Sequence, residues 1–133
     1  MSILHGVVFV AHLVVSFGTV VVLLVMRYDA QSGRLTTSPP RRNLAVRLAH
    51  LVPVTGAGVV VTSHGEMRWS ASWIAVGAVC YVVAAYLIEC RAVPAERRLR
   101  HHGVASDARI VVKSVEWSLA LFAVAALAML VQW

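Results

Sequence analysis

The stretch that decides the fold is ILHGVVFVAHLVVSFGTVVVLLVM, residues 3–26. It contains no Asp, Glu, Lys or Arg, and the first charged residue after it is Arg27. One helix needs about 20 consecutive, mostly apolar residues to cross a bilayer core. The stretch therefore predicts a membrane-spanning helix. Because it has neither a charged leader nor an evident cleavage site, we expect a retained span rather than a signal peptide.

Three more apolar blocks follow in the same chain. Hydrophobic residues make up 59% of the 133 residues and charged residues 14%, whereas a typical soluble domain is about 25% charged. A proline inside an apolar block usually ends the helix, so we expect the third helix to stop at Pro94. The sequence predicts an all-α fold, a four-transmembrane-helix bundle forming a single domain, with helices at about 3–26, 43–63, 70–93 and 108–132.

The positive charge lies mainly in two of the three connections. The first and third connections are rich in arginine, and the second, HGEMRW, is nearly neutral. The positive-inside rule then places both long loops in the cytoplasm and both termini outside. We expect these arginines to attract anionic membrane lipid. The loops are short and lack interleaved aromatic residues, so we expect no binding to nucleic acid.

Histidines are the least expected residues inside the apolar blocks. His5 and His12 share one face of the first predicted helix but lie ~10 Å apart along its axis, too far to ligate one metal ion. His50 precedes Pro53 in the second predicted helix, and His64 follows that helix. Ionisable residues in a span are costly and usually face the protein interior. These four histidines are the candidate cofactor-binding residues.

Three roles for the histidines stay open. Neutral imidazoles from two facing helices could ligate b-haem, with glycines leaving room for the macrocycle; the depths match better for His5 with His64 than for His12 with His50. A transition-metal site at the outer face would use His5, His64 and Glu66. His12 and His50 could instead carry protons.

Four other ionisable residues predict a buried polar network in the cytoplasmic half. Lys113 and Glu116 are three residues apart and are expected to pair directly on one helix face. The alternative is that the cations extend to the membrane surface and make no such network. The predicted network consists of Arg47, Glu89, Lys113 and Glu116.

The chain as a whole resembles a family of predicted bacterial integral membrane proteins of unknown function. The resemblance is carried by LHGVVFVAH, VTGAGVVV, WIAVGAVCYVVAAYLIECRAVPAERRL and EWSLALFAVAALAML. That family is similar in outline to the copper-resistance D proteins and the small haem-binding protoporphyrinogen oxidases. The resemblance implies a multi-pass protein of the bacterial inner (plasma) membrane. It also implies that His5, which matches the LH opening the first helix, takes part in haem binding.

The expected function is that of an integral membrane redox or cofactor-binding protein, with b-haem held by intramembrane histidines. Two alternatives remain: a non-catalytic accessory subunit of a larger membrane complex, and a metal or proton transporter. The sequence contains no Gly-x-Ser-x-Gly, P-loop or Cys-x-x-Cys motif, and whether the chain is an enzyme stays open. Small bundles often bury polar residues by association, so we expect a homo-oligomer or a subunit of a membrane complex.

Overall fold

The computed structural model describes residues 3–63 and 72–131, and over these residues all regular secondary structure is helical. His64 and Glu66 therefore lie outside the described residues. Four stretches are long and apolar enough to cross a membrane, as the hydropathy pattern predicts. The elements are α1 (Ile3–Gln31), the 3₁₀ turn η1 (Arg34–Thr36), α2 (Arg42–Thr62), α3 (Ser72–Tyr86), the π-helical turn η2 (Leu87–Ala92), α4 (Val93–His102) and α5 (Ala105–Val131).

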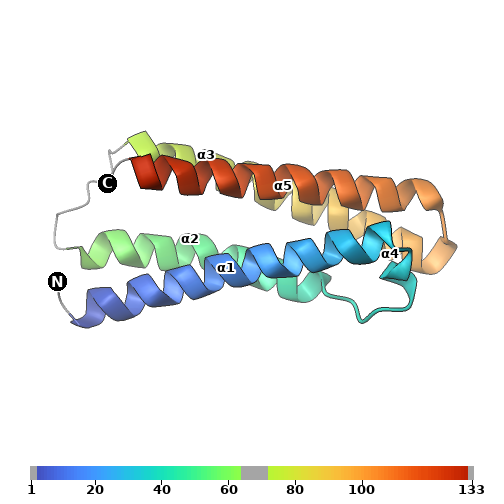
Figure 1. The fold of residues 1–133 in the computed structure, drawn as a ribbon, viewed down its shortest axis with the longest axis horizontal. Helices are drawn as coiled ribbons and strands as arrows, with labels where there is room; N and C mark the ends of the chain where they lie inside the picture. Colours follow the sequence, from blue (N-terminus) through green and yellow to red (C-terminus); the bar gives the residue numbers. More distant parts are fainter. Residues whose placement is uncertain (1–2, 64–71, 132–133) are drawn as a thin grey trace.

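The helices form two antiparallel pairs. α1 lies along α2, and α3 lies along α5; α1 also packs on α5, while α2 has few contacts with α3 (Figure 1). α1 begins and α5 ends at the same end of the bundle, as the predicted topology requires. The side of the membrane that this end faces remains a prediction from the positive-inside rule.

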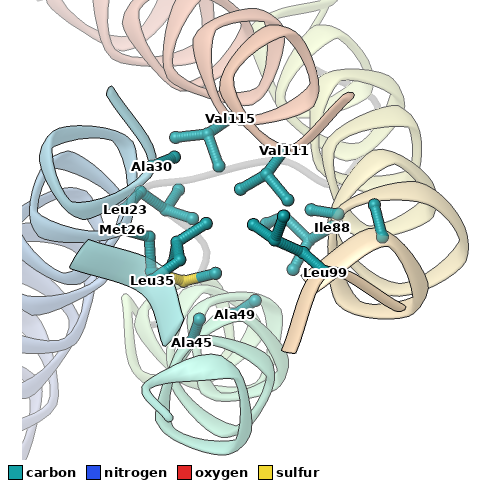
Figure 2. Packing of buried hydrophobic residues seen from close by; sticks show 12 residues of the cluster. Leu23, Met26, Ala30, Leu35, Ala45, Ala49, Ile88, Leu99, Val111 and Val115 are labelled. Carbon is teal, nitrogen blue, oxygen red and sulfur yellow. The ribbon is translucent and has the colours of Figure 1, made fainter. Parts of the chain in front are cut away.

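The buried core is concentrated toward the opposite end, which the charge pattern predicts to be cytoplasmic. Side chains from six elements meet there, among them Leu23, Ile88 and Val111 (Figure 2). Leu35 of η1 is also buried in this cluster, at 3% exposure. Beyond it, the buried carboxylate of Glu96 contacts Arg100, which also donates a hydrogen bond to the backbone carbonyl of Ser38. The connections at this end are thus packed onto the helices.

The predicted end of the third helix at Pro94 is wrong. The helix continues from α3 through η2 into α4 and ends at His102, where Gly103 adopts a positive φ of 66°. Proline interrupts a helix because it lacks an N–H for the carbonyl four residues back. In η2 the hydrogen bonds are re-spaced, since the Val93 N–H binds the carbonyl of Ile88, five residues back. This wide turn lets the chain pass Pro94 while remaining helical.

The first helix is also longer than the predicted 3–26 and reaches Gln31. Its last turn buries Asp29 and Ala30 at 7% and 6% exposure. Packing at the end of the bundle that the charge pattern predicts to be cytoplasmic therefore carries this helix beyond the apolar stretch that indicated it. The other two helices match their predicted ranges to within about three residues, within the usual variation of helix boundaries.

Candidate functional site

Two histidine–threonine contacts join α1 to α2. Nδ1 of His5 lies 3.0 Å from Oγ1 of Thr62, and Nδ1 of His12 lies 2.9 Å from Oγ1 of Thr55. The two histidines are seven residues apart on α1 and the two threonines are seven residues apart on α2, in the opposite chain direction, as expected for antiparallel helices. We call these four residues the α1–α2 seam. His5 is 6% exposed although it stands near the start of its helix.

Each threonine also contacts a backbone carbonyl of its own helix. The Thr55 hydroxyl lies 2.8 Å from the carbonyl oxygen of Leu51, and the Thr62 hydroxyl lies 2.8 Å from that of Gly58. A hydroxyl has one proton, so a threonine that donates to its carbonyl accepts from the histidine. Both contacts fix the orientation of the imidazole ring against α2.

Glycines of α2 allow this close approach. A Cβ built on Gly56 would lie 3.3 Å from Cε1 of His12, and one built on Gly58 would lie 3.0 Å from Cγ1 of Val8. The two backbones are thus drawn together at small residues, a common arrangement in membrane helix pairs. Packing this close leaves no room for a haem macrocycle between α1 and α2 at the level of His12.

A second set of polar side chains lies on the side of the bundle where α2 and α3 have few contacts. Nε2 of His50 is 2.9 Å from Oε1 of Glu89, although the angle falls outside ordinary hydrogen-bond geometry. The Tyr81 hydroxyl lies 3.4 Å from Nδ1 of the same ring. We call these three residues the His50 cluster. The π-helical turn carries Glu89, so the re-spaced backbone that accommodates Pro94 also presents this carboxylate to α2.

The His50 cluster lies deep in the predicted membrane yet is incompletely covered. The His12–Thr55 contact aligns α1 with α2, so His50 is level with residue 17 of α1. That level is ten residues, or ~15 Å, from Arg27, where the uncharged stretch ends. The His50 and Glu89 side chains are nevertheless 57% and 37% exposed. The imidazole of His50 is therefore open to the surroundings near the middle of a span.

His12 and His50, the histidines with the poorer expected depth match, have separate partners in the structure. His12 contacts Thr55, whereas His50 contacts Glu89 and Tyr81. Within the described ranges 3–63 and 72–131, no three His, Cys, Asp or Glu residues are grouped to hold a metal ion. The proposed outer-face ligands His64 and Glu66 lie outside these ranges, so the site with His5 remains a prediction.

The predicted polar network is replaced by separate ion pairs. Glu116 pairs with Arg27 of α1 at 2.8 Å rather than with Lys113, because α5 packs beside α1 and presents this carboxylate to it. Glu89 joins His50 instead. Arg47 is exposed and has no ion-pair partner among the described residues, which agrees with the expected extension of such cations toward the membrane surface.

Sequence reasoning missed Thr55, Tyr81 and the pairing role of Arg27. One signal was present: Thr55 and Thr62 have the same seven-residue spacing as the two histidines of the first helix. Matching spacings on consecutive antiparallel helices predict such contacts. Tyr81 gave no comparable signal, because the alignment of α3 with α2 is set by side chains packed elsewhere in the bundle.

The chain matches no protein-family model, no curated protein and no solved structure.

Proposed function

We propose that the chain is a non-catalytic subunit of a larger membrane assembly and that the His50 cluster marks its contact face. The observation that carries the proposal is the 57% exposure of the His50 side chain near the middle of a span. Ionisable residues at that depth are expensive in lipid and almost always face protein or a water-filled cavity. A helix of a partner subunit placed over α2 and α3 would remove this cost.

The polar and apolar side chains of this contact face indicate what kind of partner helix would fit it. The imidazole of His50, the phenol of Tyr81 and the carboxylate of Glu89 offer both hydrogen-bond donors and acceptors. Exposed Val54 and Val82, at 65% and 62%, supply apolar surface on the same two helices. A transmembrane helix with one polar side chain among small or apolar residues would satisfy both. The partner can be a second copy of the chain or another protein.

The test is native mass spectrometry of the protein extracted from its own membrane in mild detergent. We expect a stoichiometric complex heavier than the 14.4 kDa chain, and we expect His50→Leu to release the single chain. His101→Leu is the matched control, because it removes an exposed histidine at the inner end of α4 and should leave the complex intact. A wild-type protein found only as a monomer would overturn the proposal, as would a complex that survives His50→Leu.

Cofactor binding through the outer histidines is the second candidate function. It is favoured by the contact of His5 Nδ1 with Thr62, which orients this ring through one nitrogen, as a neighbouring group does for metal-ligating histidines. The candidate haem ligands are His5 and His64, with b-haem as the cofactor and redox chemistry as its contribution. The His12–His50 pair does not form, and no observation favours the transporter alternative.

An absorption spectrum of the purified protein tests this second function. Bound haem would give a Soret band that shifts on reduction with dithionite, and His5→Ala should remove it. His12→Ala serves as the comparison, since His12 is packed against Gly56 and is expected to leave the band in place. A sample with no Soret band and no bound transition metal by elemental analysis would rule out the cofactor function.

A further inference from the structure

A groove on the outside of the bundle lies between η2 and the first half of α5. It has a volume of about 310 Å³ and is lined by Leu87, Arg91, Arg109, Ile110, Lys113 and Trp117. Arg109, Lys113 and Trp117 follow one another at intervals of four residues, so they share one face of α5. Arg91 faces them from the π-helical turn. Three cationic side chains from two elements therefore converge on one hollow.

The cations of the groove have no acidic partner in the described part of the chain. Each of the five carboxylates there already contacts a basic side chain elsewhere: Asp29 with Arg41, Glu89 with His50, Glu96 with Arg100, Asp107 with Arg98 and Glu116 with Arg27. Glu116 lines a neighbouring hollow with Arg109 and Lys113 but is paired with Arg27, so the three cations still repel one another. An anion bound in the groove would relieve this repulsion and accept hydrogen bonds from all three groups.

The groove lies at the depth of lipid headgroups. Arg27 ends the uncharged stretch of α1 and pairs with Glu116 of α5, so this ion pair marks the inner edge of the apolar zone. Lys113 and Arg109 stand about one and two turns further toward the inner end. Trp117, which is 66% exposed, lies at the edge itself, where tryptophans concentrate in membrane proteins.

We propose that this groove binds the phosphate headgroup of an anionic phospholipid from the inner leaflet. The three cations would hold the phosphodiester, and the apolar side chains of Leu87 and Trp117 would contact the upper part of the acyl chains. Basic pockets between helices on the cytoplasmic side are suited to such headgroups. A zwitterionic lipid fits less well, because its own ammonium group would be brought next to the three cations. The site is separate from the His50 cluster and does not depend on the proposed contact face.

Native mass spectrometry of the protein in detergent, titrated with phosphatidylglycerol, tests the site. Phosphatidylcholine of the same chain length is the parallel titration. We expect the first lipid to be retained and the second not. The double variant Arg109→Gln/Lys113→Gln should bind phosphatidylglycerol about 30-fold more weakly, since each cation near an anionic lipid contributes about fivefold.

The matched control removes the same charge away from the groove. Arg34 and Arg97 are exposed and lack an ion-pair partner among the described residues, and the double variant Arg34→Gln/Arg97→Gln should retain the lipid. Equal weakening by both double variants would show attraction by net charge alone and overturn the site. If the groove variant does not fold by circular dichroism, Lys113→Gln alone, at an exposed position, is expected to weaken binding about fivefold. Unchanged binding would refute the proposal.

Inorganic phosphate distinguishes a lipid site from a site for the free ion. Added at the concentration of the lipid, it should not displace phosphatidylglycerol, because it lacks the acyl contacts with Leu87 and Trp117. Displacement by phosphate at equal concentration would assign the groove to the free anion and overturn the lipid proposal.

Discussion

Replacing Gly58 with alanine tests the close packing of α1 against α2. The added methyl carbon would lie 3.0 Å from Cγ1 of Val8, well inside the 3.5–4.0 Å at which two carbon atoms attract. Val8 cannot rotate away easily, because a β-branched side chain in a helix has one strongly preferred rotamer. Overpacking of this kind costs about 1–3 kcal/mol. Alanine regains about 0.5–1 kcal/mol over glycine inside a helix, so we expect a net loss centred near about 1 kcal/mol and at most about 2.5 kcal/mol.

The assay is reversible unfolding in mixed micelles with increasing SDS, followed by circular dichroism. Gly77→Ala is the matched control, since its methyl carbon would lie 3.7 Å from Cε of Met129, an ordinary contact; we expect it to be neutral or stabilising. Adding Val8→Ala to Gly58→Ala should recover most of the lost stability, because the smaller side chain makes room. If Gly58→Ala is as stable as Gly77→Ala, the two helices do not pack as closely as described.

Three further substitutions test contacts elsewhere in the bundle. Thr55→Val removes the hydroxyl that contacts Nδ1 of His12 and should cost about 0.6 kcal/mol, with an upper limit near 1.7 kcal/mol, measured by the same SDS unfolding; no loss would mean that this contact does not stabilise the bundle. Glu96→Gln leaves Arg100 without its buried counter-charge and should cost about 3–5 kcal/mol, seen as a lower thermal transition; an unchanged transition would contradict this pairing. Arg27→Gln breaks a half-exposed ion pair and should cost at most about 1 kcal/mol, a loss that shrinks with added salt; a salt-independent loss would point to packing instead.

The number of membrane-spanning helices could be predicted from the sequence. The contacts that the polar residues make between helices could not. An apolar stretch such as residues 3–26 indicates a helix whatever lies beside it, because the bilayer alone sets its length. Partners depend on which helices are neighbours. Lys113 is three residues from Glu116, yet Arg27, 89 residues away, contacts that carboxylate because α1 lies beside α5.

For the candidate sites, too, features of a single helix could be predicted, whereas contacts between helices could not. The depth of each histidine followed from counting residues along its helix, and the poor match between His12 and His50 was predicted in this way. Their actual partners, Thr55 for His12 and Glu89 for His50, required the alignment of α1 with α2 and of α2 with η2. Local rules also failed at Pro94, because one π-helical turn supplied the hydrogen-bond spacing that an α-helix could not.

The π-helical turn η2 sets the direction in which the side chains of α4 point around the helix axis. One extra residue in a turn advances the rest of the helix by about 100° around its axis. Ala95 and Leu99, both buried, face the core only with this advance in place. A chain shortened by one residue between Leu87 and Ala92 would keep its composition and hydropathy, yet it would turn this apolar face out of the bundle. The length of the segment is therefore constrained even where the identity of its residues is not.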